Sequence, residues 1–343
     1  MPQDYRSSNR RAFLETMGVG ALGLALARTA RSAGSKPLRG LFPIAPTPVT
    51  PSNELDLECL QNEIKFCNRF KVHGFAWPQI ASGWDTLTEK ERMDGMEAVL
   101  SAGKGGSTAI VIGVQDKQNN LQQSLSYAKF AAKNGADAIV SLPPSNADDK
   151  TMIEYYKTIG AATELPLFVQ TRGDMSVDLI VEMFRQIPTM KCVKDEAGYP
   201  LGRIKEIRER TNDKLAVFSG NGVRTLIDEM RLGFAGHCPT LELSDFYASA
   251  FDLWHSGKQR EAFDMFGRLQ AFGTITGATQ YLLVVRGVFK ETTKTRVSAM
   301  MGGGPAGGRG AGGGRPPVPP LDEAGKQAIR DAWSEFMKPY LRA

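Results

Sequence analysis

Cysteine and histidine are scarce in this chain, at 4 and 3 of 343 residues, and no two cysteines form a CxxC pair. Cys59 and Cys67 fall on one expected helix about two turns apart, roughly 12 Å by helical rise, which is too far for a disulfide. Cys192 and Cys238 fall on different expected strands, and the three histidines lack the spacing of metal ligands. The sequence therefore predicts neither a disulfide framework nor a metal site.

The chain also lacks a strong excess of one charge. The formal net charge is +5, and +3 of it belongs to residues 1–33, where five arginines face Asp4 and Glu15. The weak remainder gives no basis for nucleic-acid binding. A hydrophobic content of 42% suits a globular protein with one large α/β domain or two smaller ones.

The first 33 residues have the order of a targeting segment. Arg10-Arg11 and then Phe13-Leu14 precede a mild apolar stretch over 17–27, and this order resembles a twin-arginine export signal. An ordinary secretory signal or a short membrane anchor is the alternative, but the stretch is shorter than the ~20 residues of a membrane span. We expect a signal peptide over 1–33 and a periplasmic or secreted protein without a stable membrane anchor.

Short apolar runs alternate with segments of helical periodicity between residues 37 and 241. The runs with strand character cover 40–49, 74–80, 108–114, 136–142, 165–171, 190–196, 215–221 and 233–239. The helical segments cover 55–72, 89–102, 121–133, 152–163, 177–187, 201–211 and 224–232. This alternation predicts an α/β protein with a (β/α)8 TIM barrel over 37–241. A doubly wound open sheet is the alternative, although no GxGxxG follows the first strand.

Beyond the eighth strand, over 242–343, the pattern is purely helical. Helical periodicity covers 244–256, 260–272, 280–289 and 321–340. Gly and Pro dominate residues 301–320, a composition that favours a flexible surface loop. We expect a C-terminal helical region that follows the barrel and is suited to oligomer contacts.

One lysine is the best lead to chemistry. Lys194 lies near the end of the apolar run 190–196, where the sequence opens into Gly-containing loop. Active sites of parallel barrels form at the carboxyl ends of the strands. A lysine at such a place can form a Schiff base with a ketone. The other interpretation is a lysine that caps a strand end into solvent.

With the barrel laid out, residues 37–333 resemble the dihydrodipicolinate synthase and N-acetylneuraminate lyase family, which are class I aldolase-type barrels followed by C-terminal helices. The resemblance rests on short motifs in barrel order. They are Ala45-Pro46-Thr47-Pro48, Thr86-Leu87-Thr88-Glu89-Lys90-Glu91-Arg92, Gly135-Ala136-Asp137-Ala138-Ile139, Leu165-Pro166-Leu167, Val193-Lys194-Asp195, Ser219-Gly220-Asn221 and Arg315-Pro316-Pro317-Val318-Pro319-Pro320-Leu321.

The resemblance implies that Lys194 attacks the keto group of pyruvate or a related 2-oxo acid. The attacking amine must be neutral, and desolvation in a barrel mouth favours that form. The imine then serves as the electron sink, so the resemblance implies no cofactor and no metal. It also implies a homo-oligomer, a dimer or a homotetramer.

The residues that should assist this lysine depart from the family's pattern. Gln79-Ile80-Ala81-Ser82-Gly83 stands where a glycine-threonine-threonine-glycine-glutamate motif grips the substrate carboxylate, and both threonines are gone. Gln170 and Ser145 stand where the family has two tyrosines. Gln170 cannot titrate, and Ser145 is a poor proton carrier without a base. We still expect substrate contacts at these positions, namely from Gln79, Ala81, Ser82, Ser145 and Gln170.

Another group must then move protons. Side chains alternate along a strand, so Glu196 shares a face with Lys194 and is our candidate acid/base. A carboxylate that pairs with a basic residue at the rim is an equal alternative, and a carboxylate beside Lys194 favours its charged form. Arg172 suits a substrate carboxylate, the alternative being an exposed arginine. Asn221 and Cys238, at the ends of the seventh and eighth strands, complete the predicted substrate-binding residues.

These features predict a Schiff-base lyase or aldolase with an atypical proton relay. Export and the altered motifs argue against the standard lysine-biosynthesis reaction and favour a scavenged sugar acid or an aromatic 2-oxo acid. Two alternatives stay open. One is a barrel that binds a 2-oxo acid or sugar acid without turning it over, and the other is a Schiff-base hydratase or dehydratase.

Overall fold

The computed structural model describes residues 36–220, 223–275, 278–298 and 321–341. The predicted signal over 1–33, the candidate Asn221 and the Gly/Pro-rich segment 301–320 lie outside the described residues. The described residues belong to one compact unit.

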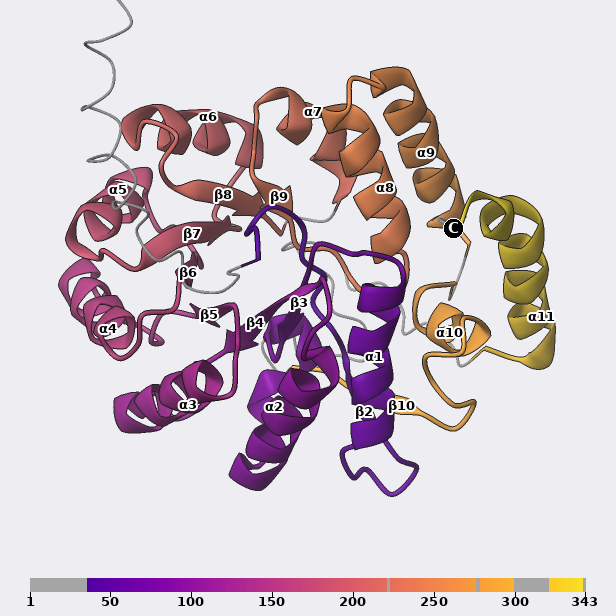
Figure 1. Cartoon of the computed structure of the whole chain (residues 1–343), viewed down its shortest axis with the longest axis horizontal. Coiled ribbons are helices and arrows are strands. Elements are labelled where there is room, and N and C mark those ends of the chain that lie inside the picture. The colour runs from indigo at the N-terminus through magenta and orange to yellow at the C-terminus, as the bar shows by residue number, and fades with distance from the viewer. Residues whose placement is uncertain (1–35, 221–222, 276–277, 299–320, 342–343) are drawn as a thin grey trace, which may run out of the picture. The chain divides into compact units, whose positions relative to one another are not determined.

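Eight parallel strands form the predicted barrel (Figure 1). They are β1 (Gly40–Leu41), β3 (Gly74–Trp77), β4 (Ala109–Gly113), β5 (Ala138–Ser141), β6 (Leu167–Gln170), β7 (Met190–Asp195), β8 (Ala216–Ser219) and β9 (Gly236–His237). Each strand from β3 to β9 pairs with the next, and β9 pairs with β1. The ring closes just after β1, where Ile44 forms a parallel bridge with Ala76 and the Ala76 amide donates to the Pro43 carbonyl at 3.0 Å.

Helices follow the strands on the outside of the ring (Figure 1). They are α1 (Leu57–Arg69), α2 (Glu89–Gly103), α3 (Leu121–Lys133), α4 (Asp149–Ala161), α5 (Val177–Gln186), α6 (Pro200–Arg210), α7 (Leu226–Arg231) and α8 (Ser244–His255). Side-chain caps fix where five of them begin, because an oxygen of the residue before the helix accepts from a first-turn amide. These capping residues are Asp56, Thr88, Asn120, Asp148 and Ser176.

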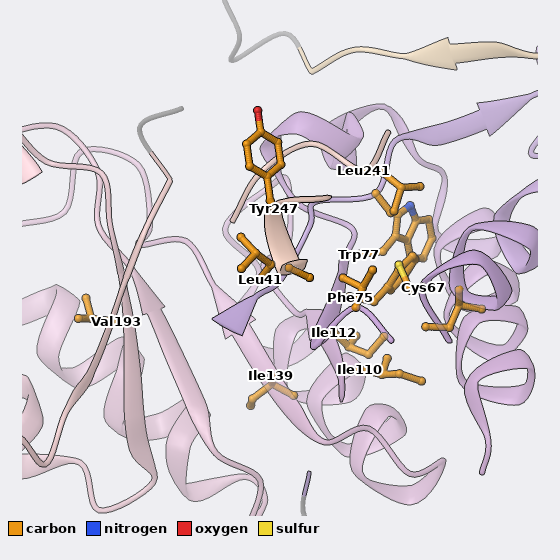
Figure 2. Packing of buried hydrophobic residues seen from close by; sticks show 14 of the residues in the cluster. Leu41, Cys67, Phe75, Trp77, Ile110, Ile112, Ile139, Val193, Leu241 and Tyr247 are labelled. Atoms are coloured by element: carbon orange, nitrogen blue, oxygen red, sulfur yellow. The ribbon is translucent and has the colours of Figure 1, made fainter. Parts of the chain in front are cut away.

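Apolar side chains form two clusters, because alternate strand residues point into the ring and out toward the helices. The inner cluster draws on strands all round the ring, and the rings of Phe42, Phe168 and Phe218 lie 5.1 to 6.0 Å apart within it. The outer cluster lies between strands and helices, and Figure 2 shows members such as Phe75, Trp77 and Ile110. Side chains thus fill the barrel interior, which leaves its ends as places for a site.

The predicted first strand over 40–49 is divided in two. Only Gly40 and Leu41 join the barrel as β1, while β2 (Thr47–Val49) pairs antiparallel with β10 (Lys294–Arg296). Pro43 and Pro46 lie between the two halves, and proline has no N–H to continue a ladder. The prediction of a purely helical region after the eighth strand was therefore wrong at β10.

The remaining C-terminal elements are helical, as predicted. They are α9 (Gln259–Phe272), α10 (Ala278–Val285) and α11 (Glu323–Ala332), the last followed by a π-helical turn (Trp333–Met337) and a 3₁₀ turn (Lys338–Tyr340). α9 packs on α8, and α11 packs on α10. Arg286 joins this region to α8 through Asp245 at 2.6 Å. Within the described part of the chain, no helix has the length and apolar content needed to cross a membrane.

Candidate active site

Lys194 lies inside the barrel at the carboxyl end of β7. Its backbone pairs with Gln170 on β6 and Phe218 on β8, and its side chain is only 6% exposed. Strand alternation places it on the same face as Cys192, a member of the inner cluster. The interpretation of Lys194 as a strand-capping lysine in solvent is therefore wrong.

Glu196 and Gln170 lie beside this amine. Lys194 Nζ is 3.5 Å from Glu196 Oε1, and Gln170 Nε2 donates a hydrogen bond to Glu196 Oε2 at 2.6 Å. The shared face predicted for Lys194 and Glu196 is what the structure has. Glu196 thus pairs with a basic residue, the lysine itself, and its part as an acid/base stays a prediction.

The candidate Cys238 is buried near Lys194 and Glu196. Burial raises the pKa of its thiol to about 12, opposed by the nearby Lys194 amine and reinforced by Glu196 and Glu229. The thiol is thus neutral at ordinary pH and lies within electrostatic range of the Lys194–Glu196 pair. It offers a small apolar wall rather than a nucleophile.

Gly220, directly after β8, makes room for the pair. A Cβ at this position would lie 2.2 Å from Glu196 Oε1 and 2.7 Å from Lys194 Cε. Any side chain at residue 220 would therefore force the carboxylate or the lysine stem to move.

The residue between the two candidates points the other way. Asp195 is 2% exposed, and the Arg203 guanidinium on α6 donates to both of its carboxylate oxygens, at 2.7 and 3.0 Å. Thr171 Oγ1 donates to the same carboxylate at 2.9 Å. None of Asp195, Arg203 and Thr171 was predicted from the sequence as a site residue. Strand alternation does place Asp195 on the outer face, but no local pattern shows that Arg203 reaches it.

The turn after β3 holds Gln79, Ala81 and Ser82. Gln79 and Ser82 are buried, and the Gln79 amide donates to Ser82 Oγ at 3.0 Å. The amides of Ser82, Gly83 and Trp84 donate to carbonyls within the same turn, so they are not available to a substrate carboxylate. Ala81 packs against the inner cluster, which places the turn at the edge of the barrel mouth.

Ser145 and Arg172 lie further out, at the rim. Both are exposed and line a cavity of about 300 Å³ together with Trp84 and Lys117. Lys194 is not among the residues that line this cavity. The predicted residues therefore fall into a buried group, with Gln170, Lys194 and Glu196, and a rim group, with Ser145 and Arg172.

The buried group has the parts of an amine nucleophile with an adjacent proton acceptor. The hydrogen bond that Gln170 donates holds the Glu196 carboxylate beside the amine. Gln170 Oε1 and Gln79 Oε1 are buried acceptors with no hydrogen-bond partner among the described residues. Across that same part of the chain, no three His, Cys, Asp or Glu side chains are grouped to hold a metal ion.

Comparison with known proteins gives a consistent answer. Residues 37–290 match the profile described as the Dihydrodipicolinate synthetase family. A 4-hydroxy-tetrahydrodipicolinate synthase of Helicobacter pylori strain G27 is 33% identical over 148 residues, 39% of this chain and 48% of that protein. The match thus spans about half the length of that relative. The corresponding enzyme of Staphylococcus saprophyticus is 26% identical over 222 residues, 63% of this chain and 72% of that protein.

Solved structures share the fold. Dihydrodipicolinate synthase from Rhodopseudomonas palustris has a TM-score of 0.67 at 19% identity, covering 86% of this chain and 97% of that one. N-acetylneuraminate lyase from Mycoplasma synoviae has a TM-score of 0.70 at 17% identity, covering 88% of this chain and 98% of that one.

Proposed function

Since the chain belongs to the dihydrodipicolinate synthetase family, we propose that it is a Schiff-base lyase or aldolase acting on pyruvate or a related 2-oxo acid. The observation that carries the proposal is the buried Lys194 amine at the end of a barrel strand, 3.5 Å from the Glu196 carboxylate. Both the curated relatives and the solved structures with this fold bear the names of synthases and lyases.

The chemistry begins with proton transfer. The Lys194 amine must lose its extra proton before it attacks the keto carbon, and Glu196 is the acceptor within reach. Attack gives a carbinolamine, which loses the former keto oxygen as water to form the imine. The imine withdraws electrons, so a carbon–carbon bond next to it is made or broken. Glu196 returns a proton, and water then hydrolyses the imine, which releases the carbonyl product and regenerates the Lys194 amine. The lysine supplies the electron sink itself, so this chemistry needs no metal or organic cofactor.

The surrounding polar groups suit a substrate that carries both a carboxylate and hydroxyls. Three amides of the 79–84 turn are already bonded, which leaves those of Ile80 and Ala81 for a substrate carboxylate, and Arg172 at the rim suits a second anionic group farther along the substrate. The buried acceptor Gln170 Oε1, beside Glu196, would take a hydrogen bond from a substrate hydroxyl. This favours a hydroxylated 2-oxo acid, such as a sugar acid, over an aromatic one.

Trapping with borohydride tests the imine. The protein is incubated with pyruvate and borohydride, and its intact mass is measured. We expect a covalent mass gain in the wild type and none in Lys194→Ala. No gain in the wild type, or an equal gain in the variant, would remove the Schiff base from the proposal.

A second measurement tests Glu196. Glu196→Gln keeps the shape and the hydrogen-bonding capacity of the side chain but cannot titrate. We expect the trapped adduct to persist while turnover falls by about 10²- to 10⁴-fold, the usual contribution of general acid–base catalysis. Unchanged turnover would exclude Glu196 from the mechanism.

Gln170 and Ser145 replace the two tyrosines of the family. This loss of the tyrosine hydroxyls favours one other function, a barrel that binds a 2-oxo acid without converting it. A mass gain with pyruvate, but no turnover of any aldol or sugar-acid substrate by the wild type, would select that function.

We further propose that the protein is exported through the twin-arginine route and works as a homo-oligomer in the periplasm or outside the cell. The order Arg10-Arg11, Phe13-Leu14 supports the route. Replacing both arginines with lysine should retain the protein in the cytoplasm. Export of that variant at the wild-type level would exclude the route, and light scattering of the purified protein gives the oligomeric state.

A further inference from the structure

The Thr171 hydroxyl is the centre of the connection between β6 and β7. Thr171 follows β6 and is 1% exposed. Its Oγ1 donates to Asp195 Oδ1 at 2.9 Å and accepts from the amides of Glu196 at 2.7 Å and Ala197 at 3.1 Å. One donor and two acceptor positions are all that a hydroxyl has, so every one is used. The backbone amide of Thr171 also donates to the Lys194 carbonyl at 3.0 Å.

Arg203 and Asp195 orient this hydroxyl. Arg203 contacts both oxygens of Asp195 and also donates to the Met175 carbonyl at 2.9 Å, which fixes the guanidinium plane. The Asp195 carboxylate can only accept, so the Thr171 hydroxyl must direct its proton toward Asp195. Its lone pairs then face the two amides. The chain of contacts runs from α6 to the backbone of Glu196.

β7 ends at Asp195, and Glu196 is the first residue of the loop that follows. The two amides bonded to Thr171 set the direction of the Glu196 side chain. On the other side, Gly220 leaves only enough room for the carboxylate where it now lies.

We propose that Thr171 is a positioning residue, which holds the Glu196 carboxylate between Lys194 and Gln170 and is itself oriented by Asp195 and Arg203. This role rests on the proposed function of Lys194 and Glu196. Without the hydroxyl, the amides of Glu196 and Ala197 lose a buried partner, and the carboxylate leaves the amine.

Competitive labelling with trace acetic anhydride tests this without any substrate. Acetylation of Lys194 is measured by peptide mass spectrometry across pH and is normalised to Lys191, an exposed lysine on the same strand. The titratable groups that face Lys194 are Glu196 and the Cys238 thiol, which directly follows β9. Glu196 contacts the amine at 3.5 Å, so Glu196→Gln should weaken this contact and raise acetylation of Lys194 at pH 8 severalfold.

We expect Thr171→Val to reproduce the pH profile of Glu196→Gln, and Thr171→Ser to restore the wild-type profile because it keeps the hydroxyl. Thr211→Val is the matched control. It removes an equally buried hydroxyl that donates to the Ile207 carbonyl on α6, and it should leave the profile unchanged. Should the valine variant not fold, Thr171→Ala makes the same comparison.

A wild-type profile in Thr171→Val or its alanine substitute would overturn the positioning role. An unchanged acetylation profile in Glu196→Gln would also overturn the positioning role, because the Glu196 carboxylate would then not face the Lys194 amine. Labelling needs no imine, so a wild type that fails to trap pyruvate would defeat the proposed function while the labelling result still decides the role of Thr171.

Discussion

The two faces of β7 each bury an ion pair, and the two pairs are built differently. On the outer face, Arg203 meets Asp195 with two hydrogen bonds of 2.7 and 3.0 Å. On the inner face, Lys194 and Glu196 make one contact of 3.5 Å. Consecutive residues of one strand therefore hold a tight bidentate pair and a loose single one.

Geometry explains the difference. A buried pair offsets the cost of desolvation only when hydrogen bonds satisfy most of its donors and acceptors. The outer pair meets this condition, with Thr171 as an additional donor to Asp195. In the inner pair the amine and the carboxylate meet at one longer distance, and Gln170 rather than a second bond from the lysine holds the carboxylate. We infer that the outer pair stabilises the fold and the inner pair serves the chemistry.

The largest expected effect comes from Lys194→Met on the inner face. We expect complete loss of the trapped adduct and a fall in turnover of about 10⁴-fold or more, since the nucleophile itself is gone. In urea denaturation, Lys194→Met should lose less free energy of unfolding than a variant that breaks the Asp195–Arg203 pair. A Lys194→Met variant that is both active and strongly destabilised would reverse the assignment of the two faces.

Asp195→Ala should break the outer pair. It leaves Arg203, 18% exposed, without its carboxylate, and we expect the free energy of unfolding to fall by about 3 kcal/mol. The control is Asp178→Ala, which removes a partner of Arg210, another α6 arginine, from a surface pair that is 35% and 83% exposed. Surface pairs contribute little, so this variant should remain close to the wild type. Equal losses in both variants would contradict a special role for the outer pair.

The fold was predictable from the sequence because each barrel element carries its own local pattern. The helix over 121–133 was predicted to the residue, and in the structure Asn120 caps it. The pairing of β2 with β10 joins residues about 250 positions apart, and neither three-residue strand has a periodic pattern of its own. Prolines at 43 and 46 mark the break, but they do not indicate the new partner.

The candidate site was predictable where strand alternation sufficed. Alternation gave the shared face of Lys194 and Glu196, and the family resemblance gave Gln170. The contacts of Thr171, Asp195 and Arg203 depend on how β6, β7 and α6 meet in space, which no spacing rule contains. The separation of Ser145 and Arg172 into a rim group likewise depends on loop conformation.

Glu63 adds a third case to the two ion pairs of β7, a buried carboxyl that pairs with no other described residue. It is fully buried on α1, and neither carboxyl oxygen has a hydrogen-bond partner among the described residues. Burial raises its pKa well above the ordinary value of 4.5, so the native carboxyl stays neutral. Above pH 4.5 the unfolded chain releases this proton and the native chain does not, so rising pH favours unfolding until the native carboxyl ionises.

Glu63→Met should remove this dependence. We expect the variant to gain stability over the wild type as pH rises from 5 to 7, by up to about 1.4 kcal/mol per pH unit, measured by urea denaturation at each pH. Glu63→Gln is the control, because it cannot titrate but still buries polar atoms. It should show the same relative pH slope without the full gain in stability. A constant difference between Glu63→Met and wild type across this range would show that the carboxyl is not held neutral.

Gly220→Ala gives the smallest expected effect and the finest test of the inner pair. The added Cβ meets the end of the flexible Glu196 side chain at 2.2 Å and Lys194 Cε at 2.7 Å, and both can shift. The free energy of unfolding should therefore change by less than about 1 kcal/mol. Displacing the carboxylate should still lower turnover by about tenfold, because a shift of an ångström at reacting groups costs one to two orders of magnitude. Gly202→Ala on α6, where a Cβ meets nothing within 4 Å, should leave turnover unchanged and support its helix. If Gly220→Ala instead lost stability and kept full turnover, the inner pair would be as rigid as the outer one, and its loose geometry would have no part in the chemistry.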